Sequence, residues 1–308
     1  MAGLPLVTGA AGFAGGHLVE RLASGGGSVL AWAHRGGAQP AVSGAVTWTA
    51  VDLLDREALR AALAAARPSV IYHCAGFADV HQAWRAPARA LRVNALGTHN
   101  LLEAVGAAGL SCRVLVTSSA MVYRPAAEAM TEDGPIGPQG PYATSKLAQE
   151  MTAAASALPI VIARPFNQAG PRQSAAYATS AFAQQIAEIE AGRLEPVLRV
   201  GNLDARRDIT DVRDTVRAYE ALADHANPRT PYNVCSGRAQ SMRELLDILL
   251  SFSRVHVRVE VDASRLRPSD SPIILGSHAR LTRDTGWMPR ISIEQTLADL
   301  LDYWRRAA

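Results

Sequence analysis

Short apolar runs alternate with longer amphipathic stretches through the first half of the chain. The runs lie at 4–8, 28–34, 46–51, 69–74, 113–117 and 160–163. Nearly continuous apolar runs of this length are typical of strands buried on both faces of a parallel sheet, and the stretches between them have helical spacing. The pattern predicts an α/β fold with a Rossmann-type, doubly wound parallel sheet covered by helices on both faces.

A glycine-rich turn follows the first predicted strand. It reads Gly-x-x-Gly-x-x-Gly and runs through Gly9, Gly12, Phe13, Ala14 and Gly15 into a helical pattern. Glycines permit a tight turn and let backbone N–H groups approach a pyrophosphate, whose charge the helix N-terminus favours. A turn that merely connects strand and helix is the alternative, but the strand–glycine–helix order favours dinucleotide binding.

The end of the second predicted strand bears on which dinucleotide is bound. It carries His34 and Arg35 where an NAD-selective site usually has a carboxylate for the ribose. A guanidinium can pair bidentately with a 2′-phosphate, although Arg35 also fits an ordinary loop. We therefore expect NADP(H) as the preferred cofactor, with NAD(H) as the alternative.

Further candidates for cofactor contacts follow the later strands. Asp52, followed by Leu53, could accept a hydrogen bond from the adenine amino group or cap the helix that begins near Asp55. Small residues in the stretch Cys74, Ala75 and Gly76 leave space for a dinucleotide to cross the sheet edge. Asn94 is an amide in an apolar helical pattern, where a satisfied core amide is the alternative.

A phenol and an ammonium are predicted to lie on one helical face, because Tyr142 and Lys146 are four residues apart. A nearby cation favours the phenolate, so we expect Lys146 to lower the pKa of Tyr142 from about 10 toward the range of a working acid or base. The hydroxyl of Ser119 follows the strand 113–117, at the sheet edge where open α/β folds bind ligands.

Composition narrows the class of protein. The 308 residues, with 48% hydrophobic, suit one large α/β unit or two closely joined domains. A net charge of +3 with dispersed arginines argues against a nucleic-acid partner. The three scattered cysteines have no metal spacing and indicate a reducing compartment. No leader or membrane-spanning run is evident, so we expect a cytoplasmic protein. Because the cysteines lack metal spacing, we expect no bound metal.

Together these residues resemble the extended short-chain dehydrogenase/reductase family, in its nucleotide-sugar branch. The glycine turn, Asn94, Ser119, Tyr142 and Lys146 match that family's pattern in order and spacing. The resemblance implies that Ser119 hydrogen-bonds the substrate oxygen, Tyr142 passes the proton and Lys146 holds the nicotinamide ribose. It implies cofactor contacts also from Thr117 and Pro165.

The resemblance also implies a domain division and a substrate site. Residues 1–165 would form the cofactor domain, with return segments near 205–240, of which 232–235 would extend the main sheet. Residues 166–308 would mainly form the smaller α/β domain that binds a nucleotide sugar. The segments 164–173, 201–214 and 262–270 resemble the GDP-mannose dehydratase and GDP-6-deoxymannose reductase branch, so a GDP-sugar is favoured.

Four residues in these segments are implied substrate contacts, although arginines in solvated loops are the alternative. Asn167 would face the sugar diphosphate, Arg207 would contact the diphosphate, Arg267 would clamp phosphate and Asp270 would accept from a ribose diol. The helices around 86–106 and 141–157 resemble those through which the family forms homodimers.

The choice of reaction depends on the residues after Ser119. Dehydratases of this branch have two acidic positions there, and this chain has Ala120 and Met121, which transfer no proton. We therefore expect NAD(P)H-dependent reduction of a 4-keto-6-deoxy nucleotide sugar rather than a 4,6-dehydratase, with an NAD-dependent 4-epimerase as the alternative. A dinucleotide sensor without turnover is disfavoured because Ser119, Tyr142 and Lys146 are all present.

Overall fold

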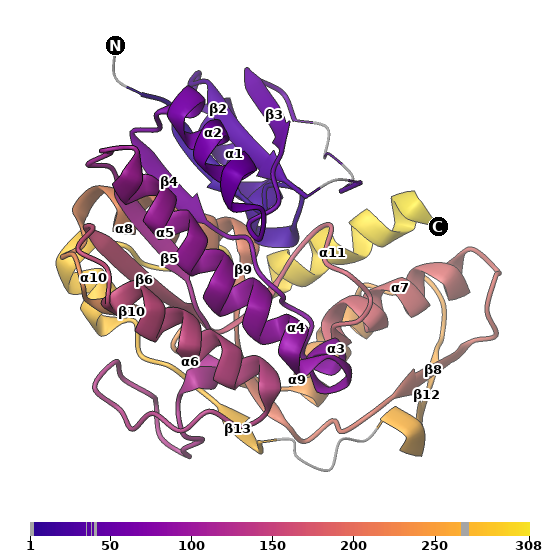
Figure 1. The fold of residues 1–308 in the computed structure, drawn as a ribbon. Coiled ribbons are helices and arrows are strands. Elements are labelled where there is room, and N and C mark those ends of the chain that lie inside the picture. The colour runs from indigo at the N-terminus through magenta and orange to yellow at the C-terminus, as the bar shows by residue number, and fades with distance from the viewer. Residues whose placement is uncertain (1–2, 35, 38, 40–41, 266–270) are drawn as a thin grey trace.

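The computed structural model describes residues 3–34, 36–37, 39, 42–265 and 271–308. Its centre is a seven-stranded parallel sheet in the order β10-β6-β5-β4-β1-β2-β3 (Figure 1). The strands are β1 (Pro5–Thr8), β2 (Val29–Ala33), β3 (Val46–Ala50), β4 (Val70–His73), β5 (Arg113–Thr117), β6 (Ile160–Pro165) and β10 (Pro231–Val234). The order reverses between β1 and β4, which is where doubly wound sheets bind ligands.

Helices cover both faces of this sheet, as the apolar runs predicted. One face packs against α1 (Phe13–Ser24), α8 (Val212–His225) and α10 (Ala279–Thr285), and the other against α2 (Arg56–Ala66), α5 (Gly97–Ala107) and α6 (Pro141–Ala154). Adjacent strand residues alternate between the two cores: Leu6 belongs to one and Val7 to the other. Burial on both faces explains why the strands lack a polar alternation.

The strands predicted in the first half of the chain are confirmed within a residue or two, and so is the returning strand. β10 pairs in parallel with β6, and Tyr232 lies opposite Ala163. The edge of the main sheet is thus built from a segment far along the chain. The division into two domains stays a prediction.

The helical region predicted around 86–106, which includes Asn94, is interrupted in the structure. The segment comprises α3 (Val80–Arg85), α4 (Pro87–Leu91) and a π-helical turn, η1 (Arg92–Leu96), before α5. A π-turn inserts one residue into the helical ladder, and such turns are common at functional sites. Asn94 lies inside it.

The later part of the chain builds smaller sheets beside the main one (Figure 1). β9 (Arg206–Asp211) pairs with β7 (Asn167–Ala169), β11 (Ala239–Ser241) and β13 (Ile273–Ile274), while β8 (Val197–Val200) pairs with β12 (Arg258–Val261). The helices α7 (Ala178–Glu190), α9 (Met242–Ser251) and α11 (Ile293–Ala307) enclose a separate apolar core. Short 3₁₀ turns, η2 (Ala120–Val122) and η3 (Ala263–Arg265), complete the elements.

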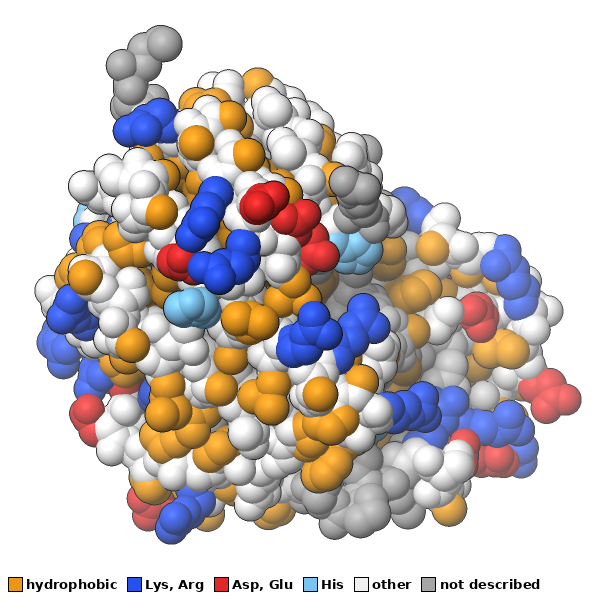
Figure 2. All heavy atoms as spheres, in the orientation of Figure 1, with side chains coloured by type: hydrophobic (Ala, Val, Ile, Leu, Met, Phe, Trp, Pro, Cys, Tyr) orange, Lys and Arg blue, Asp and Glu red, His pale blue; other side chains and the backbone are white. Residues whose placement is uncertain are grey.

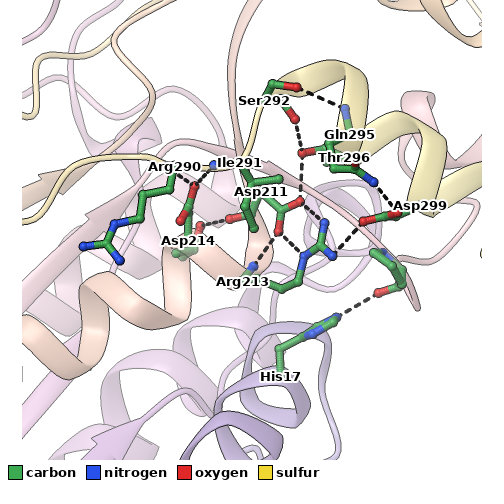
Figure 3. Close-up of polar contacts among 12 residues, drawn as sticks. His17, Asp211, Arg213, Asp214, Arg290, Ile291, Ser292, Gln295, Thr296 and Asp299 are labelled. Atoms are coloured by element: carbon green, nitrogen blue, oxygen red, sulfur yellow. Dashed lines mark hydrogen bonds and ion pairs between the residues drawn. The ribbon is translucent and has the colours of Figure 1, made fainter.

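The motif at 210–214, which the sequence grouped with the substrate segments, forms a structural junction (Figure 3). The buried Asp211 carboxylate accepts hydrogen bonds from the backbone and guanidinium of Arg213 and from the Thr296 hydroxyl at 2.8 Å. Arg213 also pairs with Asp299 at 2.7 Å. These contacts fix α11 to the corner between β9 and α8.

A second set of contacts joins the first helix to the segment after β6. The imidazole Nε2 of His17 on α1 lies 2.9 Å from the carbonyl oxygen of Pro171 (Figure 3), and Arg172 pairs with Glu20 at 2.8 Å. Burial lowers the pKa of His17, which favours the neutral imidazole. The glycine turn and the start of the second half are thereby held together.

Candidate active site

The turn after β1 is shaped so that only glycine fits at its key positions. Gly9 has φ +66°, and an added Cβ would lie 2.6 Å from the backbone of Ala75. An added Cβ at Gly15 would lie 2.2 Å from the Gly9 carbonyl oxygen. Helix α1 begins after Gly12 with neither a side-chain cap nor an acidic residue in its first turn. Its N-terminus therefore suits an anionic pyrophosphate.

Of the residues predicted to contact the adenosine part of the cofactor, the structure describes Asp52 and Leu53. Asp52 is exposed, and its Oδ1 accepts from the Leu54 amide at 2.9 Å. The cap of α2 is Asp55, which accepts from the Ala58 amide, so the alternative role of Asp52 as that cap is wrong. Leu53 is buried. Arg35 lies outside the described residues.

Asn94 links the segment after β4 to α6, the helix that carries Tyr142. Its Oδ1 accepts from the Phe77 amide at 2.7 Å, and its Nδ2 donates to the Ser145 hydroxyl at 2.8 Å. The side chain is fully buried, and a Cβ on Gly76 would approach its Oδ1 to 2.8 Å. These contacts are those of a satisfied core amide, the alternative that the sequence left open for Asn94.

Ser119, Tyr142 and Lys146 come together at the carboxyl end of β5, beside the residues that follow β4. Ser119 precedes η2, and its Oγ accepts from the Met121 amide at 3.1 Å and hydrogen-bonds the Tyr142 phenol. Tyr142 and Lys146 share one face of α6, as predicted. Lys146 is buried and donates to the carbonyl oxygen of Thr117 and to Gln149 Oε1, both at 2.8 Å.

The expected direction of the Tyr142 pKa is wrong. Burial raises the pKa of Tyr142 to about 12, although the hydrogen bond from Ser119 acts the other way. Burial also lowers the pKa of Lys146 to about 8, while the neighbouring Cys74 and Glu150 counteract it. Desolvation disfavours the charged form of both groups and is the largest cause of both shifts.

Thr117 and Pro165, which were predicted to contact the cofactor, take part in contacts between neighbouring strands. The Thr117 hydroxyl donates to the carbonyl oxygen of His73 at 3.0 Å and so ties β5 to β4. Pro165 ends β6, opposite Val234 of β10. Cys74 is partly buried, and burial raises the pKa of its thiol to about 12, which keeps it protonated and unreactive.

A cavity of about 860 Å³ opens beside the three polar residues. Ala120 and Met121, next to Ser119, form part of its wall, as does Gly140, two residues before Tyr142. Its far side is formed by β7, α7 and the segment around β9. The cavity therefore lies between the main sheet and the later part of the chain.

The predicted substrate residues fall partly on this cavity. Asn167 and Arg207 line it. Arg207 is buried and also donates to the carbonyl oxygens of Arg206 and Ser271 at 2.8 and 2.9 Å, so its guanidinium also secures the strand edge. Arg267 and Asp270 lie outside the described residues. The catalytic and cofactor roles assigned from the resemblance remain predictions, as do the substrate contacts.

Several cavity residues were missed from the sequence. His81 and Trp84 on α3, Gln173 and Tyr177 all line it. Gln149 is a further omission, since it bonds Lys146 from inside the protein. Its position three residues after Lys146 on the same helical face was the available signal. The others come from segments that approach the site only through tertiary folding.

Two wider findings concern the described part of the chain. It contains no group of three or more His, Cys, Asp or Glu side chains arranged to hold a metal ion. Among the same residues, no helix is both long and apolar enough to cross a membrane.

With the sheet, the glycine turn and the Ser–Tyr–Lys group in place, comparison with known proteins defines the class. The model of the GDP-mannose 4,6 dehydratase family matches residues 6–300. The chain belongs to this family of extended short-chain dehydrogenases/reductases that act on nucleotide sugars.

Individual relatives span the whole chain. It is 38% identical over 310 residues to GDP-6-deoxy-D-mannose reductase of Pseudomonas aeruginosa, with 97% of this chain and 96% of the relative covered. It is 30% identical to UDP-glucose 4-epimerase of Mycolicibacterium smegmatis, with 97% and 98% covered. The structure of RMD from Pseudomonas aeruginosa complexed with NADPH has a TM-score of 0.87 at 36% identity, covering 99% of this chain and 100% of that one.

Proposed function

We propose that this protein reduces a 4-keto-6-deoxy nucleotide sugar, with a GDP-sugar as the favoured substrate and NADPH as the favoured reductant. The observation that carries the proposal is the composition of the cavity wall. Ala120 and Met121 in this wall provide no acid for removing water, while Ser119, Tyr142 and Lys146, which lie beside the cavity, form a proton-transfer group. The similarity to the Pseudomonas reductase supports the same assignment.

The residues of the site divide the chemistry between them. Ser119 would hydrogen-bond the substrate carbonyl oxygen, and Tyr142, protonated at neutral pH, would donate its proton to that oxygen. The reduced nicotinamide, when bound, supplies the hydride. Two of the three N–H donors of the Lys146 ammonium bond to protein acceptors. The third donor would hold the nicotinamide ribose.

The fit of the cofactor rests on the glycine turn. The uncapped start of α1 leaves backbone N–H donors for a dinucleotide phosphate. Gly9, which packs against the Ala75 backbone, carries no side chain that could fill the space beside the turn. The preference for NADPH is supported by the NADPH complex of the similar RMD. Arg35 is our candidate for the 2′-phosphate, and Asp52 for the adenine amino group.

A nucleotide-sugar 4-epimerase is the second candidate, because UDP-glucose 4-epimerases are among the relatives. The same Ser–Tyr–Lys group would serve it. An epimerase retains its nicotinamide through the cycle, whereas a reductase exchanges it at every turnover.

The test mixes purified protein with NADPH and GDP-4-keto-6-deoxymannose and follows the reduced-nicotinamide absorbance. We expect stoichiometric loss of absorbance. No oxidation, together with conversion of UDP-glucose to its 4-epimer in the presence of NAD, would replace the reductase by the epimerase. A Tyr142→Phe variant controls for non-enzymatic oxidation.

The proposal extends to assembly and compartment. Apolar side chains gather over the helices α3 to α6, which face the viewer in Figure 2, and Trp84, Leu91, Leu96 and Met151 are exposed there. A homodimer formed through this surface would bury them.

The three free cysteines suit a reducing compartment, which we take to be the cytoplasm.

A further inference from the structure

A chain of buried hydrogen bonds leads away from Lys146 into the interior. The Lys146 ammonium donates to Gln149 Oε1 at 2.8 Å, and Gln149 Nε2 donates to the Thr98 hydroxyl at 2.9 Å. Gln149 and Thr98 are both 0% exposed. A buried amide is costly unless both of its ends are bonded, and here one end meets the ammonium and the other meets α5.

The chain continues beneath the cofactor edge. The Thr98 hydroxyl lies 2.8 Å from His73 Nε2, and His73 Nδ1 lies 2.8 Å from the Thr8 hydroxyl. Thr8 in turn accepts from the Ala75 amide at 3.2 Å. The path therefore connects Lys146 on α6 with the last residues of β4 and β1, which flank the glycine turn.

The imidazole in this chain is neutral. Burial lowers the pKa of His73 to about 3, and the charge of Lys146 acts in the same direction. A neutral imidazole has one donor and one acceptor nitrogen, and a threonine hydroxyl can serve as either, so the two hydrogen bonds of His73 can form in either tautomer. The chain thus carries no second positive charge toward Lys146.

We propose that Gln149 is a positioning residue, whose amide oxygen, fixed through Thr98 and His73, holds the Lys146 ammonium at the cofactor end of the site. The chain fixes the side-chain amide so that its oxygen faces Lys146 and its nitrogen faces away. A rotated amide would direct its N–H groups at an ammonium, which is itself a donor, and would lose the bond to Lys146. This inference rests on the part of the proposed function in which Lys146 contacts the dinucleotide.

The ammonium has other charged and titratable neighbours. From α6 itself come Glu150, whose carboxylate also pairs with Arg164 of β6, and Tyr142 one turn earlier. From the end of β4 come Cys74 and the neutral His73. Of these groups and Gln149, only Gln149 accepts a hydrogen bond from the ammonium among the contacts of the described chain.

The test measures the dissociation constant of NADPH by fluorescence titration as a function of pH, without any sugar present. Binding by the wild-type protein is expected to weaken as the Lys146 ammonium loses its proton near pH 8. Gln149→Met keeps the length of the side chain but accepts no bond from the ammonium, so the weakening should begin about one pH unit lower. Gln149→Glu places a carboxylate there, so it should begin about one unit higher.

Opposite shifts by two substitutions at one position are not expected from a loss of packing. Shifts in the same direction, or an unmoved profile in both variants, would overturn the proposal. Because the titration contains no sugar, failure of the reductase assay leaves this result interpretable.

A second pair of variants keeps the test decisive if Gln149→Met does not fold. Thr98→Val preserves the shape of the side chain and removes the hydroxyl that fixes the Gln149 amide. It should move the profile in the direction of Gln149→Met by a smaller amount. Thr152→Val removes a hydroxyl that, within the described chain, donates to Ala148 of its own helix, and is expected to leave the profile in place. Equal profiles for the two threonine variants would contradict the positioning role.

Discussion

Burial sets the protonation states of the two residues on which the mechanism depends. Tyr142, with a pKa of about 12, is a protonated phenol at neutral pH. The site is therefore prepared to donate a proton, as reduction of a carbonyl requires. Oxidation of an alcohol would need the rare phenolate.

Replacing Tyr142 by phenylalanine tests the proton donor. General acid catalysis typically contributes about 10²–10⁴-fold, so Tyr142→Phe should lower the rate of NADPH oxidation by at least about 10²-fold. NADPH affinity should change little, because the ring remains. Tyr303→Phe, on α11, is the control and should retain full activity. Wild-type rates in Tyr142→Phe would remove the phenol from the mechanism.

The pH dependence of turnover should follow Lys146. Its pKa of about 8 lies below the ordinary value, so the ammonium is present below pH 8 and is lost as the pH rises through it. We expect kcat/KM for the sugar at fixed NADPH to fall above about pH 8, whereas Tyr142 stays protonated there. A rate that remained constant to pH 10 would contradict the role of the ammonium.

At the scale of elements, the turn between β1 and α1 can be tested by comparing two glycines. Gly9→Ala forces φ +66° on alanine and drives its Cβ into the Ala75 backbone, so NADPH affinity should fall more than tenfold along with the melting temperature. Gly26 has φ +81°, and a Cβ added there would have nothing within 4 Å. Gly26→Ala should therefore cost only about 1–2 kcal/mol of stability and no affinity. Equal affinity losses would show that steric contact with Ala75 is unimportant.

A buried ion pair joins α6 to β6 directly behind the Ser–Tyr–Lys group. Glu150 and Arg164 are 2.7 Å apart and nearly inaccessible, and the Ser118 hydroxyl donates to the same carboxylate. Glu150→Ala leaves the guanidinium unpaired and should lower the free energy of unfolding by about 3–5 kcal/mol. Glu260→Ala removes the partner of the exposed Arg258 and should cost about 0–1 kcal/mol. Urea unfolding measures both, and similar losses would refute the distinction.

Several strands and helix caps could be predicted from the sequence. Strands buried on both faces leave continuous apolar runs, and caps such as Asp55 leave local polar signals, so these elements could be predicted. The π-turn around Asn94 could not, because its pattern of apolar residues differs little from that of a helix.

At the scale of the whole molecule, the limits of prediction come from long-range packing. The tyrosine and lysine were found from their spacing, but the direction of the Tyr142 pKa depends on burial, which the spacing does not encode. Tyr177, which precedes α7, and Trp84 on α3 reach the cavity through tertiary folding alone. The family resemblance supplied the roles of residues such as Asn167, whose chemistry by itself indicates no particular ligand.

The proposed dimer gives a prediction at this scale. Met151 on α6 is 67% exposed and Leu96 lies on the same broad surface. Met151→Arg should shift the sedimentation coefficient from that of a dimer to that of a monomer, because an unpaired charge would be buried at the interface. Val261→Arg, at an exposed apolar position on β12, is the control and should leave the dimer intact. A wild-type monomer would contradict the proposal outright.

The late arrival of β10 has a consequence for biosynthesis. Its four residues begin to pair with β6 only after the intervening segment has been made, and Val234 follows Pro165 by 69 positions (234 − 165). At about 5–20 residues per second, a ribosome needs roughly 3–14 seconds for that distance. Throughout this interval the nascent chain presents the open hydrogen-bonding edge of β6, a surface that recruits other strands. Chaperone demand during translation should therefore be greatest between these two points, and shortened chains that stop before β10 should aggregate.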